Sequence, residues 1–161
     1  MRERAAVERA LTRAWAAERP EMLFVDGGIS ASMEGAHSDR VVGVVKSHGT
    51  LFADASTLET VLAIGLGERT TAFLVTPRNR AAVASWYLRL RDATGHEPMW
   101  GLVRVEIAYD ERTAGPAMGA RADEVSRWIL AEAAPTAHPD ARWDTMVYGI
   151  RDCEVFLRAT Q

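Results

Sequence analysis

Two short runs in the chain contain only apolar residues and glycine, and each run ends abruptly at polar residues. The first covers residues 22–25 and is followed by Asp26 and two glycines, and the second covers residues 41–45 and is followed by Lys46. Short apolar runs bounded by turn residues are typical of strands that are buried on both faces. The chain is therefore expected to contain a sheet that is covered on both sides, with Asp26 and Lys46 at strand ends.

Two further segments alternate between apolar and polar residues with a period of two. They cover residues 86–91 and 102–107, and the loop between them contains glycine and proline. This pattern predicts a β-hairpin. Residues 70–76 predict one more strand, followed by a loop at 77–80. The sequence therefore predicts a sheet built from five segments.

Helical spacing marks the N-terminal segment and one internal segment. Residues 2–19 place apolar side chains at three- and four-residue steps, which predicts an amphipathic helix. Ser56 and Glu59 have the spacing of a capping box, in which each side chain binds a free backbone N–H group. A short helix is therefore expected at about 57–64, with Gly65 as its stop.

Two more helices are expected in the second half of the chain, one after Gly119 and one near the C-terminus. The apolar residues at helical spacing in the four predicted helices are Val7, Leu11, Ala14, Trp15, Leu58, Val125, Trp128, Ile129, Ile150, Cys153 and Leu157. Helices interspersed with strands predict the α/β class, with a mixed sheet flanked by helices. We expect a single domain over residues 1–161.

Charge and cysteine content exclude several classes of protein. The 19 Lys and Arg residues against 22 Asp and Glu give a net charge of -3, so no overall basic field marks the chain for nucleic acid or an acidic membrane. The single cysteine, Cys153, excludes an intrachain disulfide and indicates a reducing compartment, so a cytoplasmic location is expected. The apolar runs are far shorter than the ~20 residues of a membrane-spanning helix.

Asp26 is the first candidate for chemistry. In open α/β sheets, ligands bind outside the carboxyl ends of the strands, where Asp26 is expected to lie. The two glycines that follow it allow a substrate or metal to approach the backbone. Asp-Gly is also a common turn pair, in which the carboxylate caps the turn. The residue therefore has both a functional and a structural interpretation.

Lys46 and His48 follow the second apolar run. If the strand continues to His48, both side chains lie on one face, because side chains alternate along a strand. Together with Asp26 they would then contact a phosphate and a bound metal. In the alternative interpretation, Lys46 extends into solvent at the strand end and His48 is a solvated loop residue.

The predicted hairpin gathers cationic and aromatic residues. Tyr87, Arg89 and Arg91 share one face of its first strand, and Arg104 and Glu106 share one face of its second. With the two arginines of the preceding loop, they predict a local surface of the kind that follows a nucleic-acid backbone. The alternative is a set of cross-strand Arg–Glu contacts on a solvated sheet face, which contribute little to stability.

Several stretches of the chain, in their order and spacing, resemble the NurA family of DNA-end-processing nucleases, which has a ribonuclease-H-like fold. The matching stretches are LFVDGGIS at 23–30, VVGVVKSHGTLF at 41–52, GERTTAFLV at 67–75, SWYLRLR at 85–91 and GLVRVEI at 101–107. The stretch RWDTMVYGIRDCEVFLR at 142–158, which contains Tyr148, is similar to the ending of that family. The resemblance covers nearly the whole chain.

The resemblance implies metal-dependent hydrolysis of DNA with Mn²⁺ or Mg²⁺, at DNA ends in double-strand-break repair. It also implies a homodimer and a HerA-type hexameric ATPase as partner, and the short apolar runs predict no membrane association. The site residues that it indicates are Asp26 and Lys46 as catalytic residues, Asp26 as a metal ligand, Arg89, Arg91 and Arg104 as DNA-positioning residues, and Glu106, His48 and Tyr148 as further candidates.

The chain departs from the family pattern at its N-terminus. Family members are longer, and strands carrying an Asp and a Glu of the metal site precede the portion that this chain resembles. We therefore expect a domain truncated at its N-terminus, with Asp26 as the later aspartate. Two-metal hydrolysis needs several carboxylates, for which the further candidates are Glu106, Asp144, Asp152 and Glu154. Two alternatives stay open: a non-catalytic DNA- or partner-binding fragment, and a small-molecule α/β enzyme with Asp26 as general base.

Overall fold

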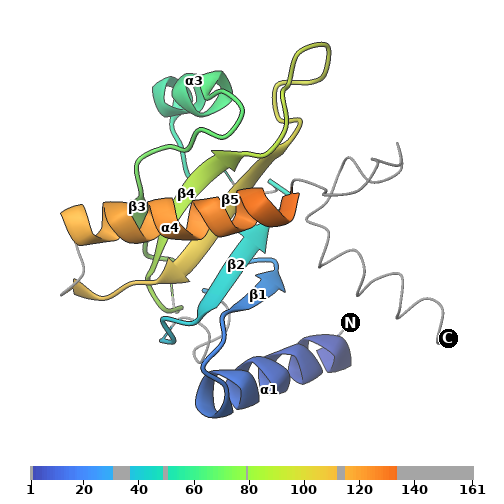
Figure 1. Ribbon diagram of the computed structural model, residues 1–161, viewed down its shortest axis with the longest axis vertical. Helices are drawn as coiled ribbons and strands as arrows, with labels where there is room; N and C mark the ends of the chain where they lie inside the picture. Colours follow the sequence, from blue (N-terminus) through green and yellow to red (C-terminus); the bar gives the residue numbers. More distant parts are fainter. Residues whose placement is uncertain (1, 31–36, 49–50, 79, 112–114, 134–161) are drawn as a thin grey trace, which may run out of the picture.

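The computed structural model describes residues 2–30, 37–48, 51–78, 80–111 and 115–133, which form an open mixed sheet flanked by helices (Figure 1). The strand order is β1-β2-β5-β4-β3, and only the β1–β2 pair is parallel. The strands are β1 (Leu23–Asp26), β2 (Val41–Val45), β3 (Phe73–Val75), β4 (Val83–Arg89) and β5 (Leu102–Ala108). The helices are α1 (Arg2–Glu18), α3 (Ala55–Ala63) and α4 (Pro116–Ala133). The predicted α/β class with a mixed sheet is confirmed.

One face of the sheet packs against α4, which crosses it in Figure 1. Trp86 of β4 is fully buried in this core, and its indole N–H donates to the Ser126 hydroxyl of α4 at 2.9 Å. That bond satisfies the only polar atom of the ring and fixes the helix against the strand. The core on this face contains Val42, Val44, Ala84, Trp86, Leu88, Leu90, Val103, Val105, Ile107, Met118, Ala122, Val125, Ile129 and Ala133.

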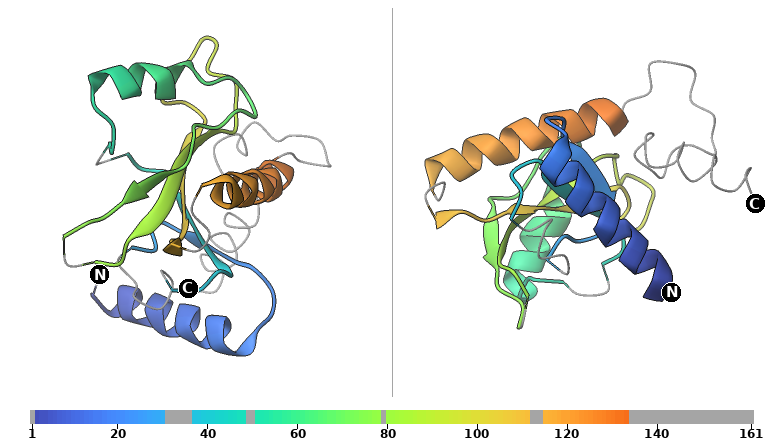
Figure 2. Two further views of the ribbon diagram at one scale, coloured as in Figure 1. Left: turned by 90° about the vertical axis from the view of Figure 1, so that its left-hand side faces the viewer. Right: turned by 90° about the horizontal axis from the view of Figure 1, so that it is seen from below.

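The opposite face carries two smaller apolar clusters. Figure 2 (left) shows α3 and α4 on opposite sides of the strands. The first cluster joins α3 to the sheet and consists of Val61, Tyr87 and Leu102. The second consists of Ile29, Val41, Val75 and Val83, and Ala16 of α1 packs against it. All seven residues of β4 are buried, as expected for a strand covered on both faces.

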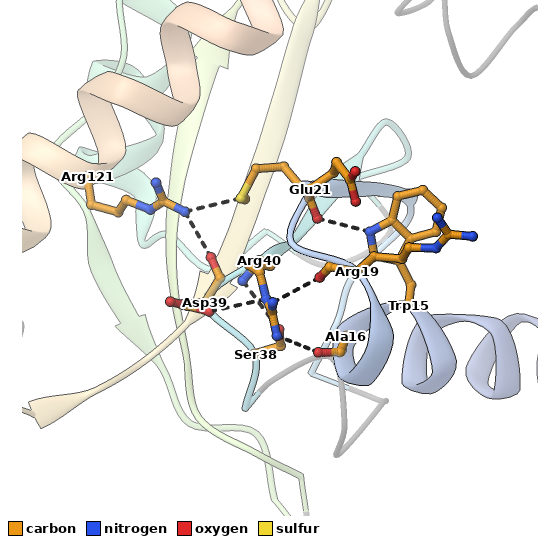
Figure 3. Close-up of polar contacts among 9 residues, drawn as sticks. Trp15, Ala16, Arg19, Glu21, Ser38, Asp39, Arg40 and Arg121 are labelled. Atoms are coloured by element: carbon orange, nitrogen blue, oxygen red, sulfur yellow. Dashed lines mark hydrogen bonds and ion pairs between the residues drawn. The ribbon is translucent and has the colours of Figure 1, made fainter.

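The predicted apolar stripe of α1 does not pack against the sheet. Val7 and Leu11 are 58% and 65% exposed. The helix is held instead at its C-terminal end, where the Arg40 guanidinium donates to the carbonyl oxygens of Ala16 at 2.5 Å and Arg19 at 2.9 Å (Figure 3). A cation at this end is favourable, because the last carbonyl groups of a helix have no partners within it. The side of the helix that carries Thr12 and Ala16 faces the sheet, so Val7 and Leu11 of the predicted amphipathic helix point away from it.

Two helix starts differ from the predicted ones. Asp54, not Ser56, caps α3, and its carboxylate accepts from the Thr57 backbone N–H at 2.8 Å. The Ser56 hydroxyl also donates to Asp54, so the predicted capping box is wrong. α4 begins at Pro116, three residues before Gly119, because proline is favourable in the first turn of a helix.

The other boundaries lie close to the predicted ones, with two exceptions. β3 is shorter than the predicted segment 70–76, of which only Phe73–Val75 pairs as a strand. The helix expected near the C-terminus lies outside the described residues. No helix in the described part of the chain is both long and apolar enough to cross a bilayer.

The cap of α3 makes the stability of the chain depend on pH. Hydrogen bonds from Thr57 and then from Ser56 hold the pKa of the Asp54 carboxyl below its ordinary value of 3.8. The carboxylate therefore stabilises the fold above that value, and this contribution is lost as the pH falls through the lower pKa of the folded state. We expect Asp54→Ala to lower Tm at neutral pH, and the Tm difference from the wild type to shrink in acid.

Thermal unfolding followed by circular dichroism over a pH series measures this difference. Asp54→Asn is the matched control, because asparagine also caps helices but does not titrate in this range. A Tm difference for Asp54→Ala that is constant down to the acid limit would show that the carboxylate is not the stabilising cap.

Candidate functional site

Asp26 and Lys46 form an ion pair at the carboxyl ends of the two parallel strands. Asp26 is the last residue of β1, and Lys46 directly follows β2. The Asp26 Oδ2 atom lies 2.9 Å from the Lys46 Nζ atom, and the two side chains are 36% and 26% exposed. The prediction that both residues lie at strand ends is confirmed, and the structure brings them together. The pair presents a carboxylate and an ammonium group to solvent at the place where α/β sheets bind ligands.

Three glycines hold the turn that follows Asp26 close to the sheet. Gly27 has a φ of 118°, which favours glycine. A Cβ atom on Gly43 of β2 would lie 2.7 Å from the Gly27 carbonyl oxygen, and one on Gly28 would lie 2.8 Å from a Glu106 carboxylate oxygen. Both distances are shorter than atoms tolerate. The glycine inside the valine run at 41–45 was the sequence signal for this close approach, which sequence reasoning missed.

Glu106 anchors the same turn from the centre of the sheet. It is 1% exposed, and its Oε2 atom accepts from the backbone N–H groups of Ile29 at 2.7 Å and Ser30 at 3.3 Å. Its Oε1 atom pairs with the Arg104 guanidinium, which also donates to the Ser85 hydroxyl at 3.2 Å. The carboxylate is thus fully engaged by one cation and two backbone donors. Its role in this structure is to position the loop after β1.

Glu106 and Asp26 lie on opposite faces of the sheet. Asp26 is level with Val44, whose side chain belongs to the core beneath α4. Glu106 pairs in register with Gly43, which is one residue earlier on β2. Because side chains alternate between the two faces of a sheet, Glu106 points to the face opposite that of Val44. The prediction that Arg104 and Glu106 share a face is confirmed. Glu106 does not complete a carboxylate site with Asp26.

His48 lies apart from Lys46. β2 ends at Val45, so the strand does not continue to His48 as the shared-face prediction required. The His48 Nε2 atom is 3.0 Å from the Leu102 carbonyl oxygen, and its ring centroid is 6.0 Å from that of Tyr87, on the α3 side of the sheet. Lys46 instead pairs with Asp26 at the end of the parallel strands. The expectation that the two residues act together was wrong.

Arg89 is a buried structural residue and not part of an exposed cationic surface. It is 1% exposed. Burial lowers the pKa of its guanidinium, whereas the nearby Asp92 carboxylate raises that pKa. The guanidinium donates to four backbone carbonyl groups, which belong to Leu62, Ile64, Pro98 and Trp100. It therefore ties the end of α3 to the hairpin loop, and its burial keeps the guanidinium away from DNA.

The other hairpin arginines are also engaged within the protein. Arg91 donates to the carbonyl oxygens of Leu90 at 2.8 Å and Ala133 at 2.5 Å. Arg104 is 7% exposed, and its guanidinium lies 4.8 Å from the centre of the Phe52 ring. The interpretation as a nucleic-acid-binding surface and the alternative of solvated Arg–Glu contacts both assumed an open sheet face, and both were wrong. The face that carries Arg89 and Arg104 is covered by α3 and by the segment before it. The loop arginines Arg78 and Arg80 are exposed.

The described residues do not by themselves fit a divalent cation. Within the ranges that the structure describes, no group of three or more His, Cys, Asp or Glu side chains is placed to hold a metal ion. Asp26 supplies one carboxylate, and the Lys46 ammonium group beside it repels cations. Mg²⁺ and Mn²⁺ sites are built from several oxygen ligands. The remaining candidates, Tyr148, Asp144, Asp152 and Glu154, lie outside the described residues.

A groove of about 690 Å³ lies between α3 and the segment that leads into β3. Hydroxyl groups and two phenylalanines line it, and Asp26 is not among its residues. A small-molecule enzyme with Asp26 as general base needs a concave pocket beside Asp26. The groove provides no support for that alternative, because it lies at another part of the fold. Its polar lining includes Asp54, Ser56, Thr57, Thr60, Thr70 and Thr71.

Comparison with known proteins assigns no family to this chain. No protein-family model matches the chain, and no curated protein matches it either. The candidate site therefore depends on the residues themselves, and the exposed Asp26–Lys46 pair is its central feature.

Proposed function

We propose that the chain is a NurA-type, ribonuclease-H-like domain that acts on DNA ends in the cytoplasm, in double-strand-break repair. The observation that supports this function best is the Asp26–Lys46 pair, 2.9 Å apart at the open ends of two parallel strands. In this proposal Lys46 contacts a phosphate and balances charge that develops on it during hydrolysis. Asp26 would supply one oxygen ligand to Mn²⁺ or Mg²⁺, and because such an ion needs several oxygen ligands, the proposal requires further carboxylates besides those that the described residues place here.

A second function is favoured by a specific observation. Among the described residues, no group of three or more possible metal ligands is found, Asp26 is paired with a lysine, and the expected DNA-positioning arginine Arg89 is buried. These features suit a non-catalytic subunit that binds DNA or a partner, such as a HerA-type ATPase, without cleaving. The two functions share Asp26 and Lys46 but differ in their dependence on metal.

The first function predicts that Asp26→Asn abolishes cleavage. With purified full-length protein, end-labelled linear DNA and Mn²⁺, we expect the cleavage rate to fall by at least about 100-fold, as when one group that stabilises transition-state charge is removed. Lys46→Met is expected to have an effect of similar size. Asp39→Asn is the matched control, because the Asp39 side chain is 92% exposed and the substitution makes the same change of charge.

Binding and cleavage are measured together, with and without EDTA. Metal-dependent cleavage that is lost in Asp26→Asn but kept in Asp39→Asn would support the nuclease. Binding without cleavage, weakened by Lys46→Met, would support the non-catalytic function and reject the first. Cleavage that is undiminished in Asp26→Asn would reject the catalytic role of Asp26.

A further inference from the structure

The groove beside α3 has the size of a small-molecule site. Its volume of about 690 Å³ lies within the range of about 300–1,000 Å³ that is typical of sites for small ligands. One side of the groove is formed by α3 and the residues directly before it, and the other side is formed by residues 70–73. The proposed nuclease function does not use this groove, because neither Asp26 nor Lys46 lines it.

Two phenylalanine rings line the groove, and each is held in place by a second group. The Arg104 guanidinium lies 4.8 Å from the centre of the Phe52 ring, which is still 39% exposed. The Phe73 ring stacks on the buried Tyr87 ring, with 5.9 Å between the two centroids. Rings that are fixed in this way lose little conformational entropy when a flat ligand ring stacks on them. The groove therefore suits a flat aromatic ligand.

Hydroxyl groups form most of the polar lining, and each can both donate and accept a hydrogen bond. The Thr70 hydroxyl oxygen accepts from the Tyr87 backbone N–H at 3.0 Å, which leaves the hydroxyl hydrogen for a ligand. Such a lining suits the polar edge of an uncharged ring. The hydroxyl groups belong to Ser56, Thr57, Thr60, Thr70 and Thr71.

The charge of the groove favours a ligand without negative groups. Among the described residues that line it, Asp54 is the only charged one. The Asp54 Oδ1 atom accepts from the Thr57 backbone N–H and from the Ser56 hydroxyl, so the second carboxylate oxygen is left to accept from a ligand. Carboxylates bind ribose hydroxyl groups in dinucleotide sites. A phosphate group, in contrast, would meet a carboxylate and no cation from the lining.

A buried hydroxyl group next to the groove favours a ligand with polar edges over an apolar one. Tyr87 is fully buried in one cluster with Val61, which lines the groove. The Tyr87 hydroxyl has no hydrogen-bond partner in the part of the chain that the structure describes. Buried polar groups are nearly always hydrogen-bonded. A polar ligand that enters beside Phe73 would supply a partner, which an apolar ligand would not.

We propose that this groove binds a ribonucleoside that carries no phosphate group. The base stacks on the phenylalanine rings, and its edge binds the hydroxyl groups of the lining. The ribose hydroxyl groups donate to Asp54. Two sources share this chemistry, a free nucleoside and the unphosphorylated end of an RNA strand. The proposal does not depend on Asp26 or on any cleavage of DNA.

Isothermal titration calorimetry of the full-length chain with adenosine tests the site. We expect one adenosine to bind per chain. 2′-Deoxyadenosine is expected to bind about 10-fold more weakly, because Asp54 loses a charge-assisted hydrogen bond. Adenosine 5′-monophosphate is expected to bind about 5-fold more weakly at low salt, because Asp54 repels its phosphate group.

Two substitutions test the contacts, each with a matched control. Phe52→Leu is expected to weaken adenosine binding by at least about 5-fold through loss of stacking. Phe24→Leu is its control, because Phe24 packs against the core beneath α4. Asp54→Asn is expected to weaken binding by about 10-fold, although asparagine still caps α3. Asp39→Asn is its control, because it makes the same change of charge at a side chain that is 92% exposed.

Circular dichroism first shows that each variant is folded. No heat of binding with adenosine up to its solubility limit would overturn the proposal, and so would equal affinities of the wild type, Phe52→Leu and Asp54→Asn. Tighter binding of adenosine 5′-monophosphate than of adenosine would indicate a phosphate site and would also overturn it. If adenosine binds as expected, tighter binding of a 5′-hydroxyl oligoadenylate would identify the RNA end as the source, and weaker binding would identify the free nucleoside.

Discussion

Replacing Arg89 by methionine is expected to lower the free energy of unfolding by about 3–5 kcal/mol, because several buried acceptors lose their donor at a cost of about 1–3 kcal/mol each. Methionine fills much of the same volume but donates no hydrogen bonds. Four carbonyl groups, two at the end of α3 and two in the hairpin loop, would lose their donor in a region with little access to water. Each buried acceptor left without a partner is costly. Urea denaturation measures the change.

Arg89→Lys and Arg80→Met are the informative controls. Lysine keeps the charge, but its single ammonium group cannot reach four carbonyl groups that a planar guanidinium spans, so it is expected to recover only part of the lost stability. Arg80 is exposed, and its replacement by methionine is expected to change stability by less than about 0.5 kcal/mol. An Arg89→Met protein as stable as the wild type that binds DNA less tightly would show that Arg89 contacts DNA.

The strands and their faces could be predicted because they depend on local patterns. Alternation of apolar and polar residues fixed which side chains share a face, and Arg104 and Glu106 do lie together. The abrupt ends of the two apolar runs likewise placed Asp26 and Lys46 at strand ends, and the structure shows that they pair there. Both features follow from the period of the strand, which a sequence displays directly.

What covers a face depends on contacts between distant parts of the chain, which a single sequence does not display. The polar face of the hairpin is typical of a solvated surface, yet Arg89 meets carbonyl groups near residue 62 and near residue 98. For the same reason, Glu106 was considered as a metal ligand, although it binds a loop 77 residues away. The exposure of Val7 and Leu11 on α1 also depends on a distant residue, Arg40, which binds a carbonyl group near the C-terminal end of the helix.

Glu106→Gln is the second substitution expected to have a large effect, with a loss of about 3–5 kcal/mol in the free energy of unfolding. Glutamine keeps the shape of the side chain but removes the charge that compensates Arg104 in the interior. The amide NH₂ group of glutamine is a hydrogen-bond donor, and it would also face the N–H donors of Ile29, Ser30 or Arg104. Because the carboxylate anchors the loop after β1, Asp26 would lose its fixed position as well.

A double-mutant cycle separates the charge from the anchoring of the loop. Arg104→Met removes the other charge, and the double variant Arg104→Met, Glu106→Gln leaves no unpaired ion, so its loss is expected to be smaller than the sum of the two single losses. The pair Arg69–Asp123, with 2.6 Å between its charged atoms and side chains that are 18% and 56% exposed, is the reference, and its coupling energy is expected to be about 1 kcal/mol or less because water reaches the carboxylate. Strictly additive losses at positions 104 and 106 would mean that Glu106 acts through the Ile29 and Ser30 N–H groups alone. In that case the arginine beside it would be stabilised by Ser85 and Phe52 and would not depend on the carboxylate.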